Sequence, residues 1–133
     1  MLTACITKPL LTPPPVAANA AADETREAIL RALLHNRWEL LSDQPGEMTA
    51  RFSRADWTMV VQIAYSNEVS IRYVSSQNLG YELSKEGTPM IHRGYNTRVL
   101  SLSRAIGTEV RIARAMTTLP PVAAPPPAGT SSQ

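Results

Sequence analysis

The side chains best suited to chemistry are one cysteine and two histidines, and they are widely separated along the chain. Cys5 lies near the N-terminus, His35 falls in an apolar segment, and His92 precedes a second apolar segment. Neither histidine has another ligand at a spacing typical of metal sites, such as four residues away on a helix, and there is no pair of cysteines. The sequence therefore predicts no metal site, no cofactor and no catalytic residue.

Cys5 follows Leu2-Thr3-Ala4, which places a small residue directly before the cysteine and a leucine three residues before it. Lipoprotein signal peptidase reads this short pattern after a basic and apolar leader. Because only four residues precede the cysteine, we expect that the leader is truncated and that Cys5 carries a palmitate-containing diacylglyceryl anchor. Ile6, in place of an aspartate, favours the outer membrane, so we expect the domain on its periplasmic side.

Proline and alanine dominate both flanks of the chain. Residues 6–22 and 117–133 contain one charged side chain between them, Lys8. Such sequences favour an open, polyproline-like chain, because small side chains recover little of the entropy lost on ordering. We predict a lipobox-like start and disordered tether over residues 1–22, one domain over 23–116, and a disordered tail over 117–133. Such a tether would hold the domain up to about 50 Å from its attachment point.

The overall composition is that of one small domain with few charges. The 133 residues carry a formal net charge of +2, and charged residues make up 18%. This balance disfavours nucleic-acid binding, which usually involves a strongly basic surface. No segment approaches the roughly 20 consecutive apolar residues that a membrane-spanning helix needs.

The middle of the chain changes from a helical period to a strand period and back. Apolar residues recur at helical spacing over 23–36 and then alternate in short segments divided by turn residues. These segments are 38–42, 47–53, 57–65 and 69–73. After a polar loop over 76–87, Thr88-Pro89 predicts the start of a final helix. We therefore predict an α+β fold in the order α-β-β-β-β-α: a four-stranded antiparallel meander with both helices packed on one face.

The final helix is predicted to have an apolar face and an arginine face. The apolar face consists of Ile91, Tyr95, Val99, Leu102, Ile106, Val110 and Ala113. The arginines on the opposite side are Arg93, Arg104, Arg111 and Arg114. Guanidinium groups bind phosphate and carboxylate groups through two parallel hydrogen bonds. The arginine face is therefore either a solvated surface or a docking surface for anionic lipid headgroups, lipopolysaccharide or an acidic protein.

Polar aromatic and amide residues gather on both sides of the 76–87 loop. They are Tyr73, Asn78, Tyr81, His92, Tyr95 and Asn96. Tyrosine rings can pack beneath a loop while hydroxyl and amide groups bind its backbone. We interpret this set as a latch that holds the loop, with His92 closing it, or otherwise as the rim of a binding groove.

The segment 73–106 resembles a group of small proteobacterial envelope lipoproteins. The shared pattern is a strand with a tyrosine, then S-x-N-L-x-Y, then I-H-x-x-Y-N near the start of the last helix. The matching residues are Tyr73, Ser76, Asn78, Leu79, Tyr81, Ile91, His92, Tyr95 and Asn96. Residues 29–40 are similar to that group's first helix, which leads to a turn with glycine or asparagine and a tryptophan. The likeness covers about residues 25–107 and departs at Arg98, where the group often has tryptophan. It implies a lipid-anchored periplasmic domain without a particular activity.

These observations predict a non-enzymatic, lipid-anchored periplasmic protein whose domain binds or scaffolds an unidentified partner. Two other classes stay open. One is a cytoplasmic interaction module that binds an acidic protein or RNA through Arg104 and Arg111. The other is a small hydrolase built around His92.

Overall fold

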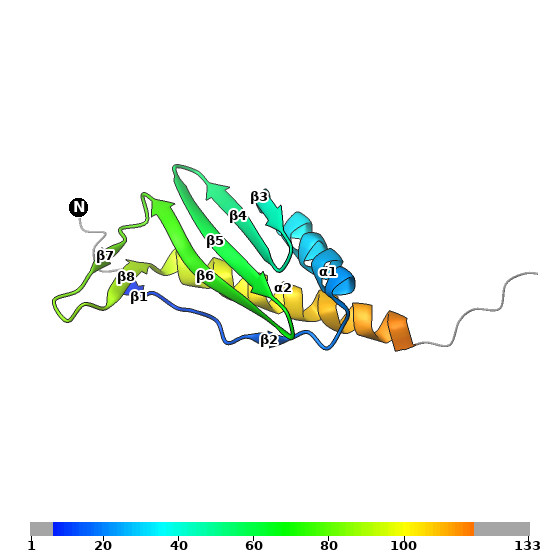
Figure 1. Cartoon of the computed structure of the whole chain (residues 1–133). Coiled ribbons are helices and arrows are strands. Elements are labelled where there is room, and N and C mark those ends of the chain that lie inside the picture. The colour runs from blue at the N-terminus through cyan, green and yellow to red at the C-terminus, as the bar shows by residue number, and fades with distance from the viewer. Residues whose placement is uncertain (1–6, 119–133) are drawn as a thin grey trace, which may run out of the picture.

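The computed structural model describes residues 7–118, which form a five-stranded sheet, a three-stranded sheet and two helices (Figure 1). The helices are α1 (Ala22–His35) and α2 (Arg93–Thr118). The strands are β1 (Thr7–Pro9), β2 (Val16–Ala17), β3 (Glu39–Gln44), β4 (Glu47–Arg54), β5 (Trp57–Tyr65), β6 (Glu68–Gln77), β7 (Glu82–Leu83) and β8 (Pro89–His92). The predicted α+β class is confirmed, whereas the predicted four strands are only part of the larger sheet.

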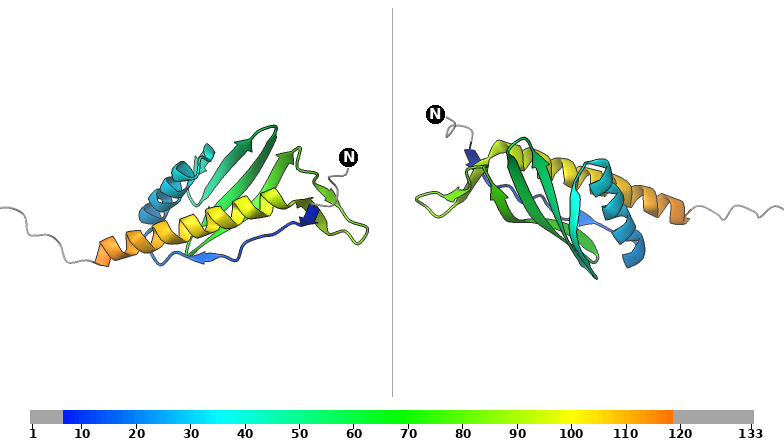
Figure 2. Two further views of the ribbon diagram at one scale, coloured as in Figure 1. Left: turned by 180° about the vertical axis from the view of Figure 1, so that it is seen from behind. Right: turned by 90° about the horizontal axis from the view of Figure 1, so that it is seen from above.

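The larger sheet has the strand order β2-β6-β5-β4-β3, and neighbouring strands are antiparallel. Its central strands follow the alternation seen in the sequence, because successive side chains of a strand point to opposite faces. Thr49 and Gln62 lie between buried neighbours and are themselves only half-buried. The fully buried residues of β4 and β5 are Met48, Ala50, Met59, Val61 and Ile63. Both helices lie on the same face of this sheet (Figure 2).

The last helix begins at Arg93, so the predicted start at Thr88-Pro89 is wrong. Residues 89–92 instead form β8, which lies between β1 and β7. Helical periodicity cannot reveal these partners: the Leu10 N–H donates to the Pro89 carbonyl, and the His92 N–H donates to the Leu79 carbonyl, each at 2.8 Å. The predicted polar loop over 76–87 contains β7 and the end of β6.

The rest of the predicted apolar face of α2 is retained. Ile91 is buried from β8 rather than from the helix, and Ala113 is half-buried. The buried members on α2 itself are Tyr95, Val99, Leu102, Ile106 and Val110. The helix continues through Thr118, two residues into the predicted tail.

Residues 7–18 belong to the domain, so the predicted disordered tether is wrong for this stretch. β1 pairs with β8, and β2 pairs with β6. Between these strands Asn96 binds the passing backbone: its Oδ1 accepts a hydrogen bond from the Leu11 N–H at 2.9 Å, and its Nδ2 donates to the Pro9 carbonyl at 3.0 Å. Proline permits this arrangement because an edge strand uses only part of its backbone groups for pairing. Residues 7–18 therefore do not form part of the expected extended spacer of about 50 Å.

Candidate functional site

Three of the predicted latch residues meet in one aromatic cluster. The rings of Tyr73 and Tyr81 stack with centres 4.6 Å apart, and Tyr95 meets Tyr73 edge-on at 5.5 Å. The Tyr73 hydroxyl lies 2.8 Å from the Ser76 hydroxyl. Burial, with a smaller contribution from Tyr73, raises the pKa of Tyr95, so its phenol stays protonated at physiological pH. The cluster is suited to packing.

The other latch residues act on separate segments. Asn78 donates through Nδ2 to the carbonyl of Asp56 in the β4–β5 turn at 2.5 Å. Asn96 holds residues 9–11, as described above. His92 accepts a hydrogen bond at Nδ1 from the Gly94 N–H at 2.9 Å, so its side chain caps the start of α2. It is the backbone of His92, rather than its imidazole, that binds the segment after β6, where its N–H donates to the Leu79 carbonyl.

The predicted arginine face of α2 is exposed and does not converge on one point. Arg93, Arg104, Arg111 and Arg114 are all exposed. At 1.5 Å of rise per residue, Arg104 and Arg111 lie about 10 Å apart along the helix axis. The Arg111 side chain donates to the Thr108 hydroxyl at 3.5 Å. Cys5 and the residues before it lie outside the described residues.

A hollow that the sequence did not predict contains three other arginines, and we call it the arginine pocket. It lies where α1 ends, β4 ends and the first half of α2 passes, and its volume is about 520 Å³. Its lining contains no acidic residue. Within residues 7–118, none of its arginines forms an ion pair with a carboxylate. The lining residues are His35, Asn36, Arg37, Phe52, Ser53, Arg54 and Arg98.

Phe52 gives the arginine pocket an apolar wall and orients one of its arginines. The guanidinium carbon of Arg98 lies 4.7 Å from the centre of the Phe52 ring, a cation–π arrangement. Phe52 in turn contacts Trp38 and Trp57, with ring centres 5.4 Å and 5.8 Å away. Arg98 is therefore supported by a packed aromatic cluster.

Arg37 follows α1 in a left-handed backbone conformation, with a φ of +64°. Its N–H donates to the Leu34 carbonyl at 3.2 Å, and the Trp38 N–H donates to the Leu33 carbonyl at 2.9 Å. This is the Schellman pattern, in which glycine or asparagine usually occupies the left-handed position. A residue with a Cβ costs roughly 1–2 kcal/mol there, so an arginine at this position lowers local stability.

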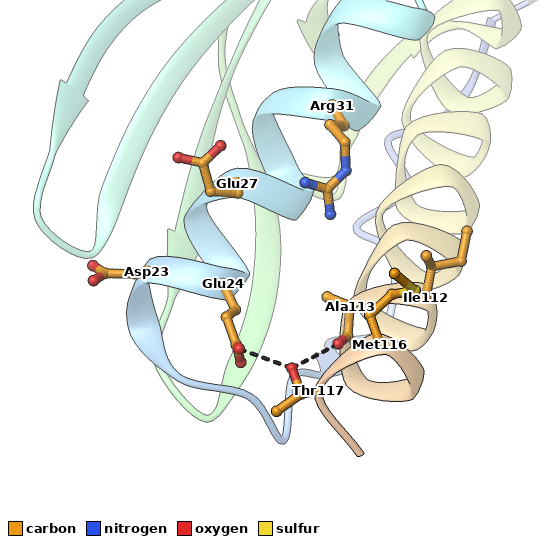
Figure 3. Close-up of a pocket in the computed structure, with 8 residues that line it drawn as sticks. All are labelled: Asp23, Glu24, Glu27, Arg31, Ile112, Ala113, Met116 and Thr117. Atoms are coloured by element: carbon orange, nitrogen blue, oxygen red, sulfur yellow. Dashed lines mark hydrogen bonds between the residues drawn. The ribbon is translucent and has the colours of Figure 1, made fainter. Parts of the chain in front are cut away.

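A second hollow, the helix groove, lies between the first turns of α1 and the last turns of α2 (Figure 3). Its volume is about 380 Å³. The Thr117 hydroxyl lies 2.8 Å from Glu24 Oε2 and 2.9 Å from the Ala113 carbonyl. Arg31 donates to Glu109 at 2.9 Å. The lining residues are Asp23, Glu24, Glu27 and Arg31 of α1 with Ile112, Ala113, Met116 and Thr117 of α2.

One signal in the sequence pointed weakly to the arginine pocket: Arg98 departs from the lipoprotein-like pattern. This signal does not show that Arg37 and Arg54 belong with Arg98, because the three residues meet only once α1, β4 and α2 are packed together. The pocket is therefore a product of the tertiary structure.

Two comparisons with known proteins give no match: no model of a protein family fits the chain, and no curated protein is significantly similar to it. Over residues 7–118, no group of three or more His, Cys, Asp or Glu side chains is placed to hold a metal ion. In the same range, neither helix is long and apolar enough to cross a membrane. The two hollows, the arginine face and the position of Cys5 are the features that suggest a function.

Proposed function

We propose that this protein is held by a lipid on Cys5 at the periplasmic side of the outer membrane, and that its domain binds a partner without catalysing a reaction. The Leu2-Thr3-Ala4-Cys5 pattern supports the anchor, and the likeness of residues 73–106 to envelope lipoproteins supports the compartment. The observation that carries the proposal is the place of this pattern, since Cys5 stands two residues before β1.

An anchor at Cys5 would hold the domain close to the membrane. Two residues span at most about 7 Å. Thr7 pairs with His92, and His92 leads directly into α2. The lipid and the first turns of α2 would thus lie near each other, with the domain resting against the headgroups instead of standing on a long spacer.

The anchor is tested by expressing the longest open reading frame that contains this chain in a Gram-negative host. We expect a mature protein that begins at Cys5, carries a diacylglyceryl mass, incorporates palmitate and fractionates with the outer membrane. Cys5→Ser should abolish the labelling, whereas Thr3→Ser, which leaves the essential pattern intact, should retain it. An unlabelled product that leaves Cys5 unmodified would refute the anchor.

The exposed arginine face supports a second candidate, a cytoplasmic module that binds an acidic protein or RNA. Binding through several arginines to a polyanion releases counterions, so its affinity should fall steeply with salt. Salt-sensitive binding of a poly-anionic RNA or peptide, lost in the Arg104→Gln/Arg111→Gln double variant, would support this candidate. Binding that is absent at low salt, or unchanged in that variant, would remove it.

A further inference from the structure

Three arginines from three different parts of the fold line one hollow. Arg37 follows Asn36, the C-cap residue of α1, Arg54 ends β4, and Arg98 lies in the second turn of α2. Among the described residues, none of the three is paired with a carboxylate. Like charges gathered in this way repel one another, so the arrangement is most favourable when an anion lies among them.

The dipole of α1 accounts for only part of this charge. The C-terminal end of a helix favours cations, which explains Arg37. His35 has an acidic neighbour, because its Nδ1 lies 3.7 Å from a carboxylate oxygen of Glu109. Arg54 and Arg98 come from a strand and from another helix, where the dipole of α1 does not require them.

We propose that the arginine pocket binds a phosphate group, as inorganic phosphate or as a phosphomonoester on a larger molecule. Phosphate presents oxygens in several directions, so guanidinium groups from three elements can each donate to it. A phosphomonoester carries a charge of about −1.5 to −2 at pH 7, which the three arginines compensate. The volume of about 520 Å³ also accommodates part of the molecule that bears the phosphate.

The Arg98 guanidinium and the backbone of Arg37 are held in place without a ligand, whereas the Arg37 side chain is exposed. Phe52 supports Arg98 at 4.7 Å, and the Schellman hydrogen bonds fix the backbone of Arg37. Ser53 adds a neutral hydroxyl between the two β4 residues that line the pocket. A donor that is already ordered, such as the Arg98 guanidinium, loses less conformational entropy on binding. The left-handed backbone conformation of Arg37 lowers the stability of the fold, and a phosphate-binding role for its side chain would explain why an arginine is found there.

The phosphate can come from a lipid headgroup or from a small diffusible molecule. Cys5 is two residues before Thr7, and Thr7 pairs with His92, six residues before Arg98. A bilayer that holds a lipid on Cys5 would therefore lie close to the pocket. This link to a headgroup rests on the proposed anchor. The recognition of phosphate by the three arginines does not depend on it.

Titration of inorganic phosphate into the purified, unlipidated 133-residue chain by calorimetry tests the shared chemistry. Arg54→Gln and Arg98→Gln should each weaken binding at least about tenfold, because each removes a charge-assisted hydrogen bond. Arg72→Gln is the matched control: it removes the same charge from an exposed position of β6 outside the pocket and should change the affinity less than about twofold. Arg98→Lys, which keeps the charge but loses the planar fork, should fall between Arg98→Gln and this control. Circular dichroism and melting curves establish that each variant is folded.

Sedimentation with phosphatidylcholine vesicles that contain phosphatidic acid separates the two sources. Vesicle binding tighter than binding of inorganic phosphate, and lost in Arg54→Gln, identifies a lipid headgroup. Phosphate binding without vesicle binding identifies a diffusible ligand. The proposal is overturned if the chain binds neither phosphate nor these vesicles. It is also overturned if the control variant loses as much affinity as the pocket variants. Because the chain is unlipidated, failure of the anchor at Cys5 leaves this test unaffected.

Discussion

The two ends of α1 carry opposite charges, and they differ in how those charges are compensated. Asp23 and Glu24 lie in its first turn, whereas His35 and Arg37 lie at its other end, and both choices suit the helix dipole. In the helix groove, Glu24 meets the Thr117 hydroxyl, and Arg31 is paired with Glu109 outside the lining. In the arginine pocket, no described carboxylate pairs with the arginines.

The fold itself explains the charges at the N-terminal end of α1, but it does not explain the charges in the arginine pocket. A carboxylate near a helix N-terminus or an ion pair between two packed helices is accounted for by local stability. Three arginines drawn from α1, β4 and α2, one of them in a costly left-handed conformation, are not accounted for in this way. The contrast assigns the ligand to the C-terminal end of α1 rather than to the groove at its N-terminal end.

The largest expected effect comes from removing the aromatic support of the arginine pocket. Phe52 is 7% exposed and contacts both Trp38 and Trp57. Phe52→Ala should lower the free energy of unfolding by about 3–5 kcal/mol, because it leaves a cavity in the core. Urea denaturation measures the loss, and Phe52→Leu, which keeps most of the volume, should lose clearly less. A change below about 1 kcal/mol for Phe52→Ala would contradict this packing role.

Arg37→Gly should stabilise the protein while weakening phosphate binding. Glycine adopts the left-handed conformation without strain, so the free energy of unfolding should rise by about 1 kcal/mol. Thermal and urea unfolding report the first effect, and phosphate titration reports the second. Arg37→Asn, which also tolerates this conformation, should behave alike. Lower stability in both variants would show that the arginine side chain itself stabilises the fold.

Glu109→Gln should weaken the connection between the two helices by a smaller amount. Glu109 pairs with Arg31 at 2.9 Å, and both side chains are partly exposed. The expected loss is about 0.5–1 kcal/mol in low salt and should shrink at high ionic strength. A double-mutant cycle with Arg31→Gln isolates the pair. A coupling energy near zero at low salt would show that packing alone joins α1 to α2 here.

Ile112→Ser at the helix groove should have the smallest effect. Ile112 is 49% exposed, so its replacement should change stability by less than about 0.5 kcal/mol. Phosphate affinity should stay unchanged, because this residue does not line the arginine pocket. An appreciable loss of phosphate binding in this variant would place the ligand at the N-terminal end of α1 and contradict the assignment to the arginine pocket.

Local patterns were sufficient for the central strands and for most of α2. In β5 the alternate spacing of Met59, Val61 and Ile63, with Thr58 and Gln62 on the opposite face, predicted the buried face. The helical spacing from Tyr95 to Val110 predicted the buried stripe of α2. Both patterns depend on a period within one element, which the chain displays in order. The start of α2 was misplaced because the backbone of residues 89–92 is paired with β1, some 80 residues earlier in the chain.

Regular spacing along the chain was enough to predict the α+β class, the meander of β3–β6 and the apolar faces of the helices, because burial imposes a period on each element. The pairing of residues 7–9 with β8 and of residues 16–17 with β6 became visible only in the folded molecule, since extended proline-rich segments suit an open tether and an edge strand equally well. Only the tertiary structure brought Arg37, Arg54 and Arg98 to one pocket. No local period connects positions so far apart, and their meeting depends on how α1, β4 and α2 pack.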